Sequence, residues 1–179
     1  MEQTPYLEIL QQGANAWNAF RFDHSIKDAD LHEVDLHGAH LRRANLTHAN
    51  LNLANLGEAD LSLADLSDSI LTLANLQKAN LNGADFSRAN LEGADLRHAK
   101  LTGVNLLGAY LRRAVLAGTD LRRAIFTNAD MRGADLTGSK LHRSNIQGAD
   151  LEGAILTNAV IIDESEAEPL TDSSIGIVA

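Results

Sequence analysis

Histidine is the residue type in this chain best suited to metal chemistry, and four of the seven histidines crowd near its start. These four are His32, His37, His40 and His48. The spacing His37-Gly38-Ala39-His40 could bring two imidazoles around one turn of the chain. A zinc or nickel site, however, needs three or four converging ligands and further groups that orient them. The sequence therefore favours exposed histidines, keeps a weak metal-binding protein as an alternative, and predicts no cofactor.

Side chains that could support catalysis are present, but they lack the local patterns that enzymes need. Ser, Asp and His recur along the chain, yet there is neither a nucleophile elbow nor a glycine-rich phosphate loop after a strand. The chain has no Cys, which excludes disulfides and thiolate metal ligands. The sequence therefore predicts a protein that is not an enzyme.

Arginine offers a third kind of chemistry, because clustered arginines bind the phosphates of nucleic acids. The candidates are Arg112, Arg113, Arg122, Arg123, Arg132 and Arg143. Whether they act together depends on how the chain places them in space. That placement follows from the repeat that organises most of the sequence.

The stretch Ile26–Ile161 repeats every five residues without a slip. Every fifth residue is Leu or another large apolar residue. A small residue, most often Ala, stands two positions earlier, and Asp or Asn commonly lies between them, as in Ala59-Asp60-Leu61. A short repeat sustained over this length determines the architecture of the chain.

A period of five fits neither a helix nor a continuous strand. Five residues advance a helix by about 500°, so successive leucines would spread around its whole surface. On a strand, an odd period would place successive leucines on opposite faces. The pattern instead fits a short extended segment followed by a corner in each repeat, with Leu and Ala inside. Ten of the thirteen glycines occupy the last corner position, where Gly tolerates a positive φ.

The run AHLRRANLTHANLNLANLGEADLSLADL (Ala39 to Leu66) resembles the pentapeptide-repeat family, and the resemblance covers residues 26–161. It implies an all-β solenoid, a right-handed quadrilateral β-helix with four pentapeptides per coil, in which residues twenty apart stack. The 28 central residues would form about seven coils. At about 4.8 Å per stacked strand, the rod would be roughly 34 Å long. The leader also resembles the segment that precedes the repeats in cyanobacterial members.

Stacking by twenty divides the six arginines into two sets of three at diagonally opposite corners, which one duplex could hardly contact together. Nucleic acid is therefore not expected as a partner. The net charge of −9 favours the opposite idea, a DNA mimic that inhibits or protects DNA gyrase, as some family members do. Between His24 and Ile161, however, sixteen acids stand against fourteen bases, while the tail from Asp163 carries five acids. A DNA mimic needs its negative field on the rod, so gyrase binding is the alternative and not the main prediction.

The leader, residues 1–23, is predicted to form a helical cap over the first coil, because the open end of a solenoid exposes unpaired strand edges. A helix over residues 5–20 would bury Trp17 against the first coil, with Phe20 beside it as the second structural residue of the cap. Gly13 interrupts this helix.

The remaining boundaries follow from composition. Residues 24–162 are predicted to form the repeat domain. Residues 163–179 are acidic and are predicted to be a flexible tail, with their contact to the last coil left open. The chain has no basic start followed by an apolar run and no apolar segment of eighteen residues, so a cytoplasmic protein without membrane contact is expected.

One side of the predicted rod carries outward apolar residues, namely Leu53, Ile70, Leu73 and Tyr110. A cluster of this kind on a polar rod indicates a binding surface, although packing within the corners would explain it equally well. The sequence therefore predicts a non-catalytic scaffold or regulatory protein that presents a rigid face to a protein partner of unknown identity. The rod is expected to be a monomer or a weak homodimer.

Overall fold

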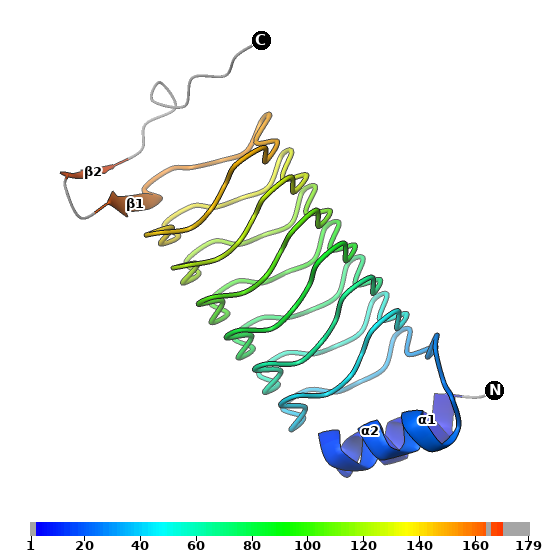
Figure 1. Cartoon of the computed structure of the whole chain (residues 1–179). Coiled ribbons are helices and arrows are strands. Elements are labelled where there is room, and N and C mark those ends of the chain that lie inside the picture. Colours follow the sequence, from blue (N-terminus) through cyan, green and yellow to red (C-terminus); the bar gives the residue numbers. More distant parts are fainter. Residues whose placement is uncertain (1–2, 164–165, 170–179) are drawn as a thin grey trace.

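Two helices, a rod of stacked coils and two short strands follow one another along the chain (Figure 1). The computed structural model describes residues 3–163 and 166–169. The helices close one end of the rod and the strands lie at the other end. They comprise α1 (Gln3–Gln11), α2 (Ala14–Asp23), β1 (Val160–Asp163) and β2 (Glu166–Pro169). Within the described ranges, neither helix is long and apolar enough to cross a membrane.

The rod is held together by single-residue β-bridges. Parallel bridges join residues twenty apart, and one occurs every five residues from Asp30↔Asn50 to Lys140↔Val160. Four bridges in every twenty residues make a coil with four faces, and the span 30–160 covers about six and a half coils of twenty residues. Each face is named here after its first central leucine, as the Leu31, Leu36, Leu41 and Leu46 faces.

The predicted stacking by twenty is confirmed, but the extended segments are shorter than the strands that the sequence analysis expected. Asn50 illustrates the reason. Its N–H donates to the carbonyl of Ala29 at 2.8 Å, and its carbonyl accepts from Leu31 N–H at 2.7 Å. A turn begins directly after the next residue, so one residue per repeat is left to bridge the neighbouring coils.

Leu and Ala fill the interior of the rod. Every central side chain from Leu31 to Leu136 has at most 2% of its surface exposed. Phe86 and Phe126 replace Leu on the Leu46 face and are also fully buried. Ile146 and Leu151, in the last coil, are only partly buried. Burying each Leu contributes about 2 kcal/mol before entropy, so the stacked centres are the main source of stability.

Every repeat from residue 33 to residue 158 ends its corner in a left-handed backbone conformation. In one such turn the N–H of Ala49 donates to the carbonyl of Leu46 at 3.1 Å, and the intervening His48 has φ 56°. Turns with a positive φ at this position favour Gly. The ten predicted corner glycines all adopt it, and the other corners force longer side chains such as Arg123 into the same conformation.

Gly103→Ala is expected to lower the free energy of unfolding by about 1 kcal/mol, because a Cβ in the left-handed region costs about 1–2 kcal/mol. Gly103 has φ 68°, and no atom lies within 4 Å of a Cβ placed there, so the effect is conformational and not steric. Thr102→Ala, one residue earlier in the same turn, is the control and should cost clearly less. Urea denaturation of both variants measures the difference. Equal free energies of unfolding for Gly103→Ala and the unmodified chain would contradict the expected cost of a Cβ in this left-handed conformation.

The Asp and Asn residues between Ala and Leu close the corners, a role that the sequence analysis did not assign. The Oδ1 atom of Asp85 accepts a hydrogen bond from the N–H of Ser87 at 2.8 Å, as in an Asx turn. The amides of Asn side chains also link coils. Asn105 Nδ2 donates to the same Asp85 Oδ1 at 3.1 Å, twenty residues back. The recurrent Asp/Asn position therefore stabilises both the turn and the stack.

The cap consists of two helices, which agrees with the interruption that the sequence predicted at Gly13 in the helix over residues 5–20. Gly13 separates them because its φ of 98° and ψ of 175° lie outside the helical region. Its carbonyl accepts the N–H of Trp17 at 3.1 Å, which begins α2. Trp17 is fully buried, as predicted, and its ring stacks on that of partly buried Phe20 with centroids 6.4 Å apart.

The cap supplies the hydrogen bonds that a preceding coil would otherwise make. In the first coil, Asn45 N–H donates to Asn18 Oδ1 at 2.7 Å, and Asn45 carbonyl accepts from Trp17 Nε1 at 2.7 Å. In the following coil, the backbone N–H and carbonyl of Asp65 bond instead to the backbone of the first coil. Side chains of α2 therefore pair the edge that a bare solenoid would leave open.

Arg21 is the central polar residue of this contact, and the sequence analysis missed it. Only 7% of its surface is exposed, and its guanidinium donates to the carbonyls of Asn45, Thr47 and Lys27 at 2.8–3.1 Å. Burial lowers the pKa of the Arg21 guanidinium below its usual value, while the nearby charges of Asp28 and Asp65 oppose that shift.

At the other end, β1 and β2 pair in antiparallel register, from Val160↔Pro169 to Asp163↔Glu166. The bridge between Lys140 and Val160 attaches β1 to the last coil. This pair of strands crosses the boundary that the sequence analysis placed between the repeat domain and the flexible tail. The rest of the predicted tail, residues 164–165 and 170–179, lies outside the described residues.

Candidate protein-binding face

The four apolar residues of the predicted binding surface lie on the Leu31 face and at its following corner. Ile70 and Tyr110 occupy the same column of bridge residues, each bridged to Asn90 between them. Leu53 and Leu73 are the last residues of successive corners. Leu53, Ile70, Leu73 and Tyr110 are 45%, 44%, 58% and 53% exposed. All four therefore present side chains to solvent, as the sequence predicted.

Leu53, Ile70 and Leu73 gather on two adjacent coils. The N–H of Leu53 donates to the carbonyl of Thr72 at 2.9 Å, which places the two corners next to each other. The Leu73 side chain also packs over Gly93 in the following coil, where a Cβ would come within 2.8 Å of its Cδ2 atom. Corner packing thus occurs at Leu73, yet more than half of its surface remains exposed.

Tyr110 lies apart from the other three, two coils or about 9.6 Å along the rod from Ile70. It is bridged to Asp130, which forms an ion pair with Arg132 at 2.6 Å. The hydrogen bond from Arg132 is the main cause that holds the pKa of Asp130 below its usual value. Tyr110 therefore lies where the apolar surface meets a charged one.

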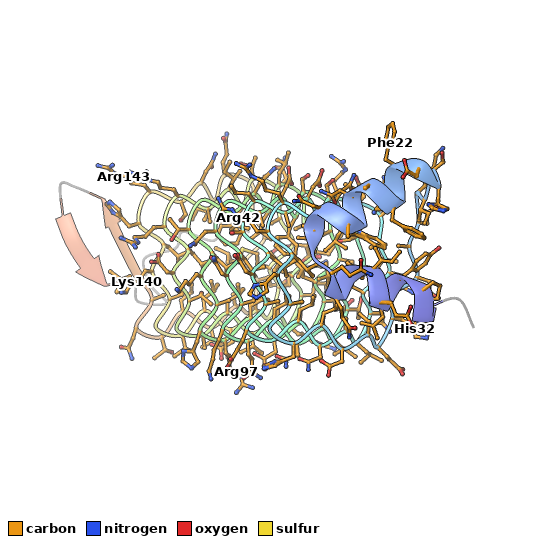
Figure 2. The ribbon with its side chains drawn as sticks, turned by 90° about the horizontal axis from the view of Figure 1, so that it is seen from below. Phe22, His32, Arg42, Arg97, Lys140 and Arg143 are labelled. Atoms are coloured by element: carbon orange, nitrogen blue, oxygen red, sulfur yellow. The ribbon has the colours of Figure 1, made fainter. Side chains whose placement is uncertain are left out.

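The remaining faces carry fewer exposed large apolar side chains. Within the described part of the chain these are Phe22, Leu63, Leu107, Ile125 and Ile155. Phe22 is 84% exposed and points away from α2 in Figure 2, and the sequence analysis gave it no surface role. Helical geometry would have predicted its exposure, because Phe22 follows buried Trp17 by five residues and therefore lies about 140° around the helix from it. Four of the nine exposed apolar side chains belong to the Leu31 face and its corner, which makes that face the most apolar.

The histidines of the first coils do not form a metal centre among the described residues. No group of three or more His, Asp or Glu side chains there could hold a metal ion. His32, on the Leu31 face, directs Nδ1 at Asp30 Oδ1, 2.9 Å away within the same repeat.

Comparison with protein-family models matches pentapeptide repeats, in eight copies, to residues 29–68, 69–107, 105–143 and 126–158. The chain belongs to the pentapeptide-repeat family. The pentads are thus those of a known family, and the buried Leu and Ala positions of the rod from Ala29 to Leu156 lie within the matched ranges. A search of curated proteins gave no match.

Several solved pentapeptide-repeat structures are similar to this protein. HetL, a protein involved in heterocyst differentiation regulation in the cyanobacterium Nostoc sp. strain PCC 7120, is 35% identical, with a TM-score of 0.50. The match covers 77% of this chain and 67% of HetL. The alr5209 protein of Nostoc PCC 7120 is 38% identical over 49% of this chain and 64% of its own, with a TM-score of 0.37. QnrB1, a plasmid-mediated fluoroquinolone resistance protein, is 18% identical over 71% of this chain and 79% of its own, with a TM-score of 0.40.

Proposed function

We propose that this pentapeptide-repeat protein is a non-catalytic regulatory or scaffold protein that binds a protein partner through its Leu31 face. The observation that carries the proposal is the exposure of Leu53, Ile70 and Leu73 on adjacent coils of a polar rod. Interfaces gain most of their affinity from a few such apolar anchors surrounded by polar groups. A stack of single-residue bridges also holds these anchors rigidly, which reduces the entropy lost on binding.

The conformation of the corner leucines supports this choice of face. Leu53 and Leu73 have φ 59° and 57°, a region that is costly for a bulky residue and natural for Gly. Gly occupies the same corner column at Gly93 and Gly133. A large apolar side chain at such a position adds surface that the turn itself does not need.

The relationship to HetL supports a regulatory role. That protein is involved in the regulation of heterocyst differentiation, and it is 35% identical to this chain. A non-catalytic regulator acts by binding another macromolecule. The partner that we propose for this chain is a protein.

The charges of the rod favour this role over mimicry of DNA. Several carboxylates at bridge positions form an ion pair with an arginine two residues later. Examples are Asp95 with Arg97 and Asp130 with Arg132, each at 2.6 Å. These pairs neutralise the negative field that a DNA mimic would display along its length.

Combined replacement of Leu53, Leu73 and Tyr110 by Ser is expected to weaken binding of the partner by about 30-fold or more, because it removes the anchors of the proposed interface. The three side chains are exposed, so the melting temperature should change little. The measurement is quantitative capture of the partner from native lysate, followed by titration of the captured protein. The control combines Leu63→Ser and Leu107→Ser, two exposed leucines on other faces, and should retain binding.

Equal affinity of the triple variant and the unmodified rod would exclude the Leu31 face as the binding site. Gel filtration of both proteins tests whether the same surface joins two copies of the rod. A dimer of the unmodified protein that the triple variant loses would make a second copy of this chain the partner.

A further inference from the structure

Two adjoining surface pockets lie on the Leu41 face and its following corner, near the end of the rod that carries β1. Their volumes are about 390 and 340 Å3, and Arg122 and His142 line both of them. Lys140 and Val160 complete the first pocket. Figure 2 shows Lys140 beside the strands at this end of the rod. The bridge between Lys140 and Val160 fixes their spacing, so the methylene stem of Lys140 and the Val160 side chain give this pocket an apolar part.

The second pocket is more polar. Thr102, Arg123 and Arg143 line it together with the two shared residues. Figure 2 places Arg143 near the same end of the rod as Lys140. The N–H of Arg123 donates to the carbonyl of His142 at 3.0 Å, so these residues come from directly adjacent coils. Thr102 stacks in the same column one coil earlier, because the backbone carbonyl of Arg122 accepts the N–H of Gly103 at 2.8 Å.

The pockets concentrate positive charge on an acidic protein. Four permanent cations line them, on a chain whose net charge is −9. On the Leu41 and Leu46 faces between residues 100 and 160, the sequence contains one carboxylate, Asp120.

The single carboxylate orients one of these cations. Arg122 Nε and Nη2 donate to the two oxygens of Asp120 at 2.8 and 2.6 Å, in a fork geometry. This hydrogen bond is the main cause that lowers the pKa of Asp120, and Lys140 also contributes. A guanidinium has five N–H donors, so the fork leaves N–H groups that can donate to a second acceptor. The Nδ1 atom of His142 is buried without a hydrogen-bond partner in the described structure, which marks an unsatisfied polar atom between the two pockets.

We propose that these pockets bind a small organic phosphate monoester. The phosphate would lie in the second pocket, against Arg122 and Arg123, because planar guanidinium forks match the oxygens of a phosphate dianion. The Thr102 hydroxyl adds a neutral donor. The small apolar body of the ligand would lie against Val160 and the stem of Lys140. Together the pockets fall within the size range of small-molecule sites.

Phenyl phosphate is the probe for this site, with inorganic phosphate as the comparison, and isothermal titration calorimetry measures both. Phenyl phosphate is expected to saturate one site and to bind about ten-fold more tightly than inorganic phosphate, because its ring is buried in the apolar part. Combined Arg122→Gln and Arg123→Gln is expected to weaken phenyl phosphate by about 100-fold, through the loss of two charge-assisted hydrogen-bonding groups. Thermal melts verify that the variant is folded.

The sequence offers a matched control. Leu111-Arg112-Arg113-Ala114 repeats the same four residue types as Leu121-Arg122-Arg123-Ala124 at another corner. Combined Arg112→Gln and Arg113→Gln changes net charge equally and should leave binding within about two-fold. Absence of saturable binding, or equal loss in both double variants, would overturn the proposal. The proposal would also be overturned if phenyl phosphate bound only to the combined Glu166→Gln and Glu168→Gln variant. In that case the occupant of the pockets in the unmodified chain would be its own acidic segment.

Discussion

Leu91→Asp is expected to abolish the cooperative unfolding of the rod. Leu91 is fully buried in the middle of the Leu31 face, stacked between Leu71 and Leu111. The substitution removes about 2 kcal/mol of apolar burial and adds the several kcal/mol needed to bury a carboxyl group without a partner. Because total stabilities are about 5–15 kcal/mol, a loss of this size consumes most of the margin. Neighbouring coils support one another, so disruption at one coil spreads along the stack.

Leu73→Asp makes the same chemical change on the outside of the rod and serves as the control. Leu73 is 58% exposed at a corner, so Asp there should change the free energy of unfolding by less than about 0.5–1 kcal/mol. Circular dichroism during thermal unfolding compares the two variants. We expect a sharp transition for Leu73→Asp and a broad or absent one for Leu91→Asp. A Leu91→Asp protein that melts like the unmodified chain would show that this centre is not part of the packed core.

The repeat made most of the rod predictable, because period and burial are coupled in a solenoid. A large apolar residue every fifth position, with Ala two residues before it, identified the buried centres from Leu31 to Leu136. The glycines at the last corner position indicated a left-handed turn, and all ten adopt it. The corners that lack Gly, such as that of Arg123, adopt the same turn. Residues other than Gly prefer a negative φ, which would disfavour this turn. Here the stacked bridges of neighbouring repeats override that preference.

The ends of the rod were less predictable, because no repeat constrains them. A helical pattern placed Trp17 in the cap, and Gly13 marked the interruption that divides the cap into two helices. Arg21 was missed because a long cation in a leader is ordinarily solvated. Its role follows only from the tertiary structure, in which open carbonyls of the first coil face α2. Spacing relative to Trp17 was the available signal, since residues four apart share a helix face.

The twenty-residue period of the sequence identified the apolar face, but it did not predict the ion pairs beside that face or the pockets on the Leu41 face. Leu53, Ile70 and Leu73 follow directly from the twenty-residue period. Tyr110 shares their face, yet the fork between Arg132 and Asp130 beside it depends on side-chain conformations that periodicity does not determine. The pockets around Arg122 were missed for the same reason. Stacking by twenty places the arginines at two opposite corners, which argues against binding of a duplex, whereas a small anion needs only one of the two corners.

Arg21→Met is expected to lower the free energy of unfolding by about 3 kcal/mol, and to reduce the melting temperature by roughly 6–12 °C. Met preserves much of the buried volume but donates no hydrogen bonds. The carbonyls of Lys27 and Thr47 lose the guanidinium that binds them at 2.8 and 3.0 Å. Each buried acceptor without a partner costs about 1–3 kcal/mol. The cap should also detach more often, which exposes the edge of the first coil and promotes association between rods.

Differential scanning calorimetry measures the first effect, and light scattering after gel filtration at increasing protein concentration measures the second. Arg97→Met is the control, because the Arg97 side chain is about half exposed and pairs with Asp95 in its own repeat. It should shift stability by less than about 1 kcal/mol and leave the rod's association state unchanged. If Arg21→Met and Arg97→Met behaved alike, the hydrogen bonds of Arg21 would not hold the cap in place. Trp17 and its aromatic neighbours would then be sufficient to close the end of the solenoid.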